Sequence, residues 1–592
     1  MEEKQVASYE FGPYRLLLSE RLLLRDGKPV PLTPRVFDTL LVFVQNNGRL
    51  LTKDELMKLI WGDRFVEEGN LTQNIFILRK TLGESAQDHQ YLVTIPLQGY
   101  RFVAKVKEHR DEDAPSHTAE MSPSKSRAAG ARVTSIAVLP FTILNDPAGE
   151  NFVGIGISDT LITKLSNLKR LVVRPTTAIL RYASDKQDLP AVGRELQVEA
   201  VLDGTIQHLE ERIRVNVRLV NVSDGVTLWA DKFDDQFTDI FAVQDSIAKY
   251  VAQALEVELS GEEQRQLSKS YTDNIETYQL YVKGRYFWNT RTEKGLLKSI
   301  DYAQQVIRLE PGNALAYLGL ADSYTLLGQY LYLHPQAAFP KAKTATVKAL
   351  EIDPTLAETY ASLAEVAFFY EWDWAAAERY YRRAAEMNPN YASGRHWYAW
   401  FLLSMGRFEE ATEKIKEAQK LDPASLTINT SLGLPFFYQR RYERAIEQYR
   451  ETLEMDASFM QARYYLASAL TQLGLYEEAI AEYQKIIPVE YTQQASALLG
   501  YTYAVSGERE KASAVLADLK RLAGQRYVSP YLEAIIYAGL GEADHAFALL
   551  EKACQERAVW MVFLKVDPFL DRLRDDPRFV NLLRWVGFRS IE

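Results

Sequence analysis

A spacing of 34 residues through the second half of the chain most constrains its fold. Pro354, Pro389 and Pro423 lie 35 and 34 residues apart. Turn residues recur at nearly the same interval: Gly406, Arg440, Gly474, Gly507 and Gly541. Small residues keep the same register: Ala377, Ala411, Ala445, Ala479, Ala512 and Ala546. This period predicts stacked helical hairpins, because one such unit cannot bury its apolar face without a neighbour.

The repeating segments also resemble a known family. FEEATEKIKEAQKLDP and YERAIEQYRETLEMD resemble tetratricopeptide repeats. We count about eight repeats in residues 274–557, the first degenerate, and expect residues 558–592 to cap the array. The resemblance implies a concave groove, and the family's groove register falls here on Phe369, His396, Trp400, Phe437, Tyr464, Tyr501 and Tyr531. Aromatic groove residues suit a protein or peptide partner, although packing between repeats is the alternative for any single one.

The N-terminal region contains three helical patterns and a hairpin. Apolar periodicity predicts helices over Pro34–Asn46, from a capping box at Thr52 to Trp61, and over about Asn70–Leu82. Gly99 then separates two strand-like runs. On the third helix, apolar spacings of four, three and four predict a buried stripe: Leu71, Ile75, Leu78 and Leu82. Three helices and a hairpin in this order predict a winged helix, whose third helix fits the DNA major groove.

This region resembles a second family. LTPRVFDTLL, NLTQNIFILRKTLG and YLVTIPLQGYRFV resemble the OmpR/PhoB-type DNA-binding domain, which we place at residues 8–107. The resemblance implies that residues matching Gln73, Asn74, Ile77 and Arg79 face DNA. Neighbouring residues complete the predicted contact set: Lys53, Thr72, Lys80, Gln98 and Arg101. Phe76 and Ile77 replace arginines common in the family, and either read thymine methyl groups or pack on protein.

Charge limits how tightly this domain alone can hold double-stranded DNA. Residues 1–107 carry 15 Lys and Arg against 13 Asp and Glu, and the whole chain has a net charge of -10. Neutralising phosphates supplies most of the affinity for nonspecific DNA. We therefore predict weak binding by one domain and stronger binding by a homodimer on paired half-sites.

Residues 108–133 are rich in Pro, Ser, Ala and charge, and predict a flexible linker. Regulators of the CadC/ToxR type, which the architecture resembles, place a membrane helix here. No run in this chain approaches the roughly 18 to 20 apolar residues of such a helix. We therefore expect no membrane partner and a cytoplasmic location. The single cysteine, Cys554, fits a reducing compartment.

Residues 134–260 predict a small α/β domain. SIAVLPF and RLVVRP are expected strands, Asn151–Leu168 and Ile240–Leu259 expected helices, and Asp203-Gly204 an expected turn. The stretch resembles the TolB N-terminal-like domain, which implies no catalytic residues. Gly154 and Gly156 favour a tight helix entry over a phosphate site. Asp231, Asp234 and Asp235 favour a solvated loop over a cation site.

The predicted fold class is multidomain: a winged helix-turn-helix (α+β), a small α/β domain and an all-α solenoid. The leading interpretation is a soluble DNA-binding transcriptional regulator whose array binds a protein or peptide partner. One alternative is an interaction scaffold with a vestigial winged helix; another is a non-catalytic relative of cyclase and repeat signalling proteins. With seven His and one Cys, the chain offers few candidates for catalysis, and we predict no catalytic residue, metal or cofactor.

Overall fold

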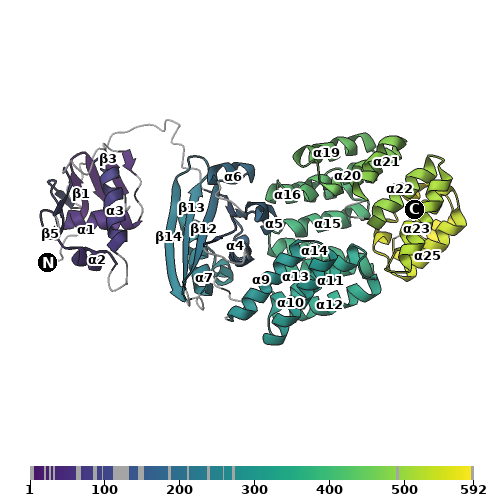
Figure 1. The fold of residues 1–592 in the computed structure, drawn as a ribbon, viewed down its shortest axis with the longest axis horizontal. Helices are drawn as coiled ribbons and strands as arrows, with labels where there is room; N and C mark the ends of the chain where they lie inside the picture. The colour runs from purple at the N-terminus through teal and green to yellow at the C-terminus, as the bar shows by residue number, and fades with distance from the viewer. Residues whose placement is uncertain are drawn as a thin grey trace, which may run out of the picture. The chain divides into compact units, whose positions relative to one another are not determined.

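The computed structural model forms two compact units, residues 1–128 and residues 129–592 (Figure 1). The described residues are 6–18, 22–25, 28–30, 32, 34–61, 68–84, 90–95, 98–110, 133–144, 152–183, 188–209, 212–236, 240–255, 257, 259–267, 269, 272, 274–487 and 492–588. Most of the predicted linker lies outside them.

The first unit begins with a five-stranded antiparallel sheet in the order β4-β3-β2-β1-β8. Its strands are β1 (Val6–Phe11), β2 (Tyr14–Leu17), β3 (Leu22–Arg25), β4 (Lys28–Val30) and β8 (Lys107–Arg110). Because β8 pairs with β1, the sheet includes residues 108–110, which the sequence assigned to the linker. The ring of Phe11 lies 5.3 Å from that of Phe102 and joins this sheet to the hairpin.

The three predicted helices follow as α1 (Pro34–Gln45), α2 (Lys53–Trp61) and α3 (Glu68–Thr81). The capping box at the start of α2 is confirmed. The amide of Glu55 donates to Oγ1 of Thr52 over 3.2 Å, and the amide of Thr52 donates to Oε2 of Glu55 over 2.9 Å. These bonds satisfy two amides that the first helical turn leaves without partners.

A three-stranded sheet carries the wing, in the order β5-β7-β6. Its strands are β5 (Leu50–Leu51), β6 (Leu92–Ile95) and β7 (Gly99–Phe102). Gly99 has φ 145°, and a Cβ at this position would lie 2.0 Å from the carbonyl oxygen of Leu51. Glycine is therefore required both by the backbone conformation and by the approach of β5.

The second unit opens with a six-stranded sheet in the order β11-β9-β12-β13-β14, in which β10 pairs with β12. The strands are β9 (Ser135–Val138), β10 (Thr142–Leu144), β11 (Val172–Val173), β12 (Ala200–Leu209), β13 (Arg212–Asn221) and β14 (Thr227–Gln236). The helices are α4 (Phe152–Ser166), α5 (Thr176–Ile179), α6 (Leu189–Glu195), α7 (Ile240–Ala254) and α8 (Gly261–Leu267).

Two details of this sheet correct the sequence predictions. β12 runs unbroken through Asp203 and Gly204, where a turn was expected. Glycine is needed there for packing, since a Cβ at Gly204 would lie 2.3 Å from the ring of Phe141. The acidic cluster is part of β14 rather than a loop, and Arg214 binds the Asp234 carboxylate at 2.7 Å.

Eight helix pairs follow within residues 275–555. Residues 488–491, within this range, are not among the described residues. They are α9 (Ile275–Asn289) with α10 (Glu293–Leu309), α11 (Ala314–Gln329) with α12 (Pro335–Ile352), α13 (Ala357–Val366) with α14 (Trp374–Met387), α15 (Ala392–Ser404) with α16 (Phe408–Leu421), α17 (Leu426–Ser431) and α18 (Leu434–Tyr438) with α19 (Tyr442–Met455), α20 (Met460–Gln472) with α21 (Tyr476–Ile486), α22 (Thr492–Val505) with α23 (Arg509–Ala523), and α24 (Pro530–Leu540) with α25 (Ala543–Gln555).

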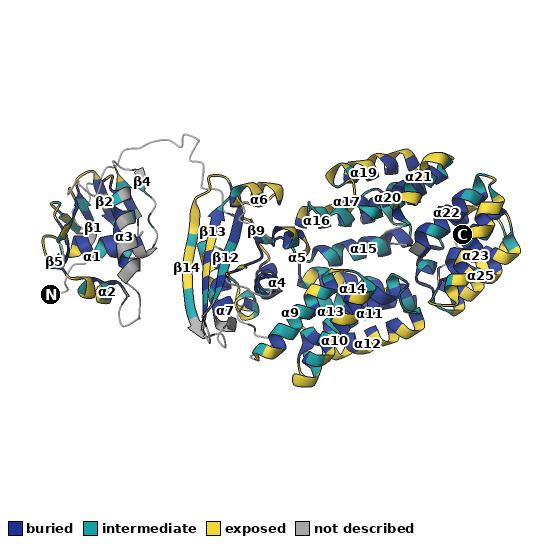
Figure 2. Cartoon of the chain, in the orientation of Figure 1, coloured by how far each residue is buried: buried dark blue, intermediate teal, exposed yellow. Residues whose placement is uncertain are grey.

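The backbone conformation follows the repeat register that the sequence predicts. All five turn residues have positive φ, from 62° at Arg440 to 91° at Gly507. All six register alanines are fully buried. Figure 2 shows buried and exposed residues alternating along the helices of the array. Small residues there let the helices approach closely, which is why the register keeps them.

The α/β domain is docked on the array rather than tethered to it. Nδ2 of Asn390 donates to three carbonyl oxygens at the end of α4 and beyond, those of Ser166, Leu168 and Leu171, at 2.8 to 3.1 Å. Gly156 lies inside α4, where a Cβ would approach Val282 of α9 to 2.3 Å. This glycine therefore serves helix packing, not the helix entry that the sequence suggested.

Candidate nucleic-acid interface and repeat groove

The predicted buried stripe of α3 is confirmed. Leu71, Ile75, Leu78 and Leu82 are all at least 97% buried. Two predicted DNA contacts flank this stripe and touch protein. Asn74 donates to Oγ1 of Thr39 on α1 over 3.1 Å, and Ile77 packs partly buried on the core. Both residues help to seat α3 on the domain.

Arg79 also differs from its predicted position. The resemblance to the DNA-binding family implied that it faces DNA. Its Nη2 instead donates to the carbonyl oxygen of Leu92 over 3.1 Å and to Oγ1 of Thr94 over 2.8 Å, both on β6. At about 100° per residue, position 79 lies on the flank of the helix, beside the hairpin. Arg79 therefore fastens the wing to α3.

The other predicted DNA contacts divide into two groups. Lys53, in the first turn of α2, and Gln98, in the wing, are exposed, whereas Arg101 is half-buried in β7. The side chains at Thr72, Gln73, Phe76 and Lys80 lie outside the described set, although the backbone of α3 is described there. Glu84 accepts from the amides of Tyr91 and Leu92 and so fixes the start of β6.

The predicted groove residues of the array are not an open surface. Five of them are at least 91% buried: Phe369, His396, Phe437, Tyr501 and Tyr531. Trp400 and Tyr464 are partly buried against the same core. The expectation of an exposed aromatic groove is therefore wrong for this conformation of the chain. The residues that cover the groove come from the chain itself.

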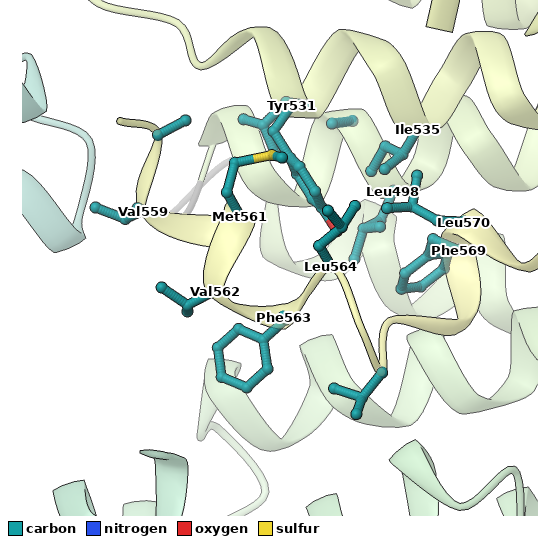
Figure 3. Close-up of a cluster of buried hydrophobic side chains, with 14 of the residues drawn as sticks. Leu498, Tyr531, Ile535, Val559, Met561, Val562, Phe563, Leu564, Phe569 and Leu570 are labelled. Atoms are coloured by element: carbon teal, nitrogen blue, oxygen red, sulfur yellow. The ribbon is translucent and has the colours of Figure 1, made fainter. Parts of the chain in front are cut away.

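The covering residues are 558–588, which we call the C-terminal segment. It consists of two 3-10 helices, η4 (Val559–Phe563) and η5 (Pro568–Leu573), and of α26 (Pro577–Val586). The ring of Phe563 stacks on Tyr438 at 5.3 Å and meets Trp400 edge-on at 5.8 Å. The ring of Phe569 meets Tyr501 edge-on at 4.9 Å. Figure 3 shows Phe563 and Phe569 on the segment, and Tyr531 beside Met561 and Leu564.

Polar bonds fix the same segment. Tyr531 donates its hydroxyl hydrogen to the carboxylate of Asp567. Lys565 donates to the carbonyl oxygen of Met405 over 3.1 Å. Arg440 donates to the carbonyl oxygen of Val566 over 2.7 Å and forms an ion pair with Asp571 at 2.6 Å. Burial raises the pKa of the Asp567 carboxyl, and the hydrogen bond from the Tyr531 hydroxyl lowers that pKa only in part.

A small cavity of about 40 Å³ remains between the segment and the array. Aromatic rings line most of it, including Tyr464, Tyr465 and Trp560, and Asp567 contributes a carboxylate. Nε1 of Trp560 is buried without a hydrogen-bond partner. The fit of the segment is therefore less complete than that of an ordinary core.

His396 contributes to a buried polar chain below the segment. Its Nε2 lies 2.7 Å from Oγ of Ser431 and accepts from Nε1 of Trp400 over 3.1 Å. Burial lowers the pKa of the imidazole to about 4. The ring is therefore neutral near pH 7, as an acceptor of the indole hydrogen must be.

Arg440 was predicted only as a turn residue, although the sequence held a signal for a further role. Four of the five turn positions are glycine, and the fifth is this arginine, held at φ 62°. Such a backbone costs a non-glycine residue about 1 kcal/mol or more. Tyr438 and Phe368 were also missed, and nothing in the repeat register distinguishes them from packing residues.

Comparison with known proteins agrees with this organisation. A family model described as "Transcriptional regulatory protein, C terminal" matches residues 27–102. Tetratricopeptide repeat models match residues 380–413 and 430–497. The chain thus contains an OmpR/PhoB-type domain and tetratricopeptide repeats, as predicted. A model of the HilA/YgeH-like transcriptional regulator second domain matches residues 132–250, while the TolB-like resemblance of that stretch stays a prediction.

Similar proteins include regulators and one named as an enzyme. Transcriptional regulator HilA of Salmonella typhi is 24% identical over 420 residues, which are 70% of this chain and 71% of that protein. A putative adenylate cyclase 3 of Rhizobium meliloti is 33% identical over 188 residues, 32% of each chain. The solved DNA-binding domain of E. coli CadC is 30% identical and is wholly covered, matching 18% of this chain with a TM-score of 0.17.

Two kinds of feature are absent from the described residues. No helix among them is long and apolar enough to cross a bilayer. The same residues contain no group of three or more His, Cys, Asp or Glu placed to bind a metal ion.

Proposed function

We infer that this chain is a DNA-binding transcriptional regulator with a repeat array. One observation carries the inference: residues 27–102 match a regulator DNA-binding model and fold as three helices and a hairpin with the predicted buried stripe on α3. The similarity to HilA, a transcriptional regulator, extends over 70% of the chain and so beyond the DNA-binding domain.

We propose that α3 reads DNA through positions 73, 76 and 80. At about 100° per residue, these positions lie opposite the buried stripe, whereas Asn74 and Arg79 lie on its flanks. Thr72 and Lys53 border this side, and Gln98 and Arg101 belong to the wing that flanks the helix. The domain has a net charge of only +2, so we expect a shallow dependence on salt, with a log-log slope on the order of -3 to -5 per domain.

A variant pair of the full chain tests this surface. Gln73→Ala with Lys80→Ala should weaken binding to a bound genomic fragment by at least about tenfold, because each direct contact is worth about 1 to 3 kcal/mol. Lys107→Ala is the matched control, since Lys107 is exposed on β8, away from α3. Anisotropy titrations across salt concentrations measure both. Equal effects in the two variants would contradict the assignment of this face.

We further propose that two chains bind paired half-sites and that the array binds a protein partner. The modest charge of the domain supports the first proposal, because one domain neutralises few phosphates. The eight helix pairs support the second, because stacked repeats chiefly provide extended surface.

The alternative is an interaction scaffold whose winged helix no longer binds DNA. Immunoprecipitation of the chain with its genomic DNA separates the two functions. Enriched, discrete sites fit a regulator, and their absence, together with no binding to duplex DNA at low salt, fits a scaffold. The similarity to a protein named as an adenylate cyclase is tested by incubating the chain with ATP, and we expect no cyclic product.

A further inference from the structure

The Arg440 turn differs from the four glycine turns of the register, and it shares its positive φ with three non-glycine residues at earlier turns of the array: Arg291, Leu331 and Trp372. Residues 406, 474, 507 and 541 are glycines with φ between 77° and 91°, a region that L side chains rarely adopt. Arg440 takes the same conformation, at φ 62°. A residue kept at such a position despite the backbone cost points to a task of its side chain.

That task is to hold the C-terminal segment through one main-chain oxygen and one carboxylate. Nη1 of Arg440 donates to the carbonyl oxygen of Val566, and Nε and Nη2 bind the two carboxylate oxygens of Asp571 at 3.1 and 2.6 Å. From the segment, Arg572 donates to the carbonyl oxygen of Gly539 over 3.0 Å. Bonds to main-chain atoms recognise a peptide conformation whatever its side chains are.

Two aromatic sites give this recognition its specificity. Phe563 is surrounded by three rings, those of Phe368, Trp400 and Tyr438, at 5.3 to 6.4 Å. Six residues later, Phe569 enters a second site beside Tyr501 and Phe437, and Figure 3 shows both phenylalanines on the segment. Buried rings in pockets are the usual anchors of a binding interface.

We propose that this groove is a peptide-binding site whose resident ligand is the chain's own C-terminal segment. The partner in trans is a protein segment of the same chemistry: two aromatic side chains six residues apart and a carboxylate two residues after the second. The inference rests on the proposed binding of a protein partner by the array, and it names the site and the chemistry of that partner.

The C-terminal segment determines how tightly a partner must bind the groove to displace it. A covalently linked ligand acts at an effective concentration on the order of millimolar, so a partner in solution competes at a disadvantage. The cavity beside Asp567 and the unpartnered Nε1 of Trp560 mark where the segment fits less tightly. Its entry is also unusual, since Arg557 has φ 54° immediately before Ala558. Weakening the segment should therefore open the groove.

The test uses a fluorescent peptide of residues 557–575 and the full chain. Wild-type chain should bind this peptide only weakly in anisotropy titrations. Phe563→Ala with Phe569→Ala, the loosened chain, should bind the peptide at least about tenfold more tightly than wild type does. A peptide in which both phenylalanines are alanine is the matched control and should not bind. DNA binding should be the same in both chains, so failure of the groove and failure of the regulator function are separable.

Arg440→Gly in the loosened chain separates recognition from turn structure. Glycine suits the turn, so a merely structural residue 440 predicts equal or better behaviour. We expect at least about tenfold weaker peptide binding than in the loosened parent. A folded, loosened chain that binds no peptide would overturn the proposal, as would equal binding after Arg440→Gly.

A cleavable variant covers the outcome in which the alanine variants unfold. A protease site inserted between Glu556 and Arg557 leaves all groove contacts of the folded chain in place until it is cut. After cleavage, the labelled peptide should replace the released segment, as followed by size-exclusion chromatography. If the cleaved segment is never replaced by the labelled peptide, the segment is a fixed part of the core and the proposal is wrong. Light scattering that finds a dimer of wild-type chains, lost in the alanine variant, would show exchange between two copies instead.

Discussion

The winged helix and the repeat groove were predicted from equally regular patterns, yet the two regions differ in what lies on the predicted face. In the winged helix, the buried stripe Leu71, Ile75, Leu78 and Leu82 leaves one side of α3 facing away from the core. In the array, the register placed aromatic residues on the groove, and the C-terminal segment covers them. A periodic pattern therefore predicts which face of a helix a residue lies on, but it does not predict which other part of the chain covers that face.

Two arginines, one in each region, also make contacts that the sequence patterns did not predict. Arg79 and Arg440 each donate to a carbonyl oxygen of another segment, Leu92 on the wing and Val566 on the C-terminal segment. Sequence analysis gave the first a role in DNA contact and the second only a turn position. Each fastens a neighbouring segment in the structure. How much such contacts stabilise each region can be measured with single substitutions.

The largest effect is expected at the wing. Gly99→Ala should destabilise the first unit by about 4 kcal/mol, because the new Cβ would meet the Leu51 carbonyl oxygen and φ is 145°. Gly48→Ala is the matched control. It has φ 76° but nothing within 4 Å of the added Cβ, so we expect about 1 kcal/mol. Thermal denaturation and DNA binding measure both. Similar losses in the two variants would mean that close approach of β5 does not define the wing.

The next largest effect is expected where the α/β domain docks on the array. Arg174 is buried and donates to the carbonyl oxygens of Leu196, Gln197, Lys420 and Leu421 at 2.6 to 3.0 Å. Arg174→Met leaves these four acceptors, two of them in buried bonds, without their donor and should cost about 3 kcal/mol in urea denaturation.

Arg181→Ala is the control for docking. Arg181 pairs with Glu195 on the surface, where both side chains are about half exposed, so its loss should cost less than about 0.5 kcal/mol. If Arg174→Met is equally mild, the domain and the array are not held as one unit by this interface.

A smaller effect sharpens the assignment of Arg79. Arg79→Ala removes a charged donor from the Leu92 carbonyl and from Thr94, and should cost about 1.5 kcal/mol. Amide hydrogen exchange should quicken in β6 more than in α1. DNA affinity should fall less than in Gln73→Ala with Lys80→Ala. Unchanged exchange in β6 with a large loss of DNA affinity would restore Arg79 as a direct DNA contact.

The smallest effect concerns acid. Burial lowers the pKa of His396 to about 4, below its ordinary value of 6.5, so the unfolded chain binds more protons between these values. Its contribution to stability is complete above pH 6.5 and is lost as the pH falls toward 4. At pH 5.5 the loss is about 1 kcal/mol.

Comparing wild type with His396→Gln isolates this contribution. Burial raises the pKa of Asp322, Asp422 and Glu365 to about 6, 6 and 7, which changes stability in the opposite direction but equally in both chains. Urea denaturation at pH 7.5 and 5.5 should show that the variant loses less stability than wild type. Parallel losses would show that His396 is protonated in the folded groove.

Much of the fold could be predicted because its signals are local. The capping box at Thr52, the stripe on α3 and the 34-residue register each involve residues within a few turns or one repeat. The candidate site was less predictable. The flank position of Arg79 follows from helix geometry and could have been found, whereas the contact of Asn74 with Thr39 depends on how α1 crosses α3.

The sequence by itself determined the repeat array, the winged helix and the turn residues, because spacing and backbone conformation act within short stretches of chain. Tertiary structure alone decided that the groove is occupied, that the α/β domain docks on the array, and that Arg440 is more than a turn. The bonds responsible join residues far apart, such as Arg440 to Val566, 126 positions away, and Trp374 to Gly587, 213 positions away. Contacts at such separations follow no period, so only the folded chain brings them together.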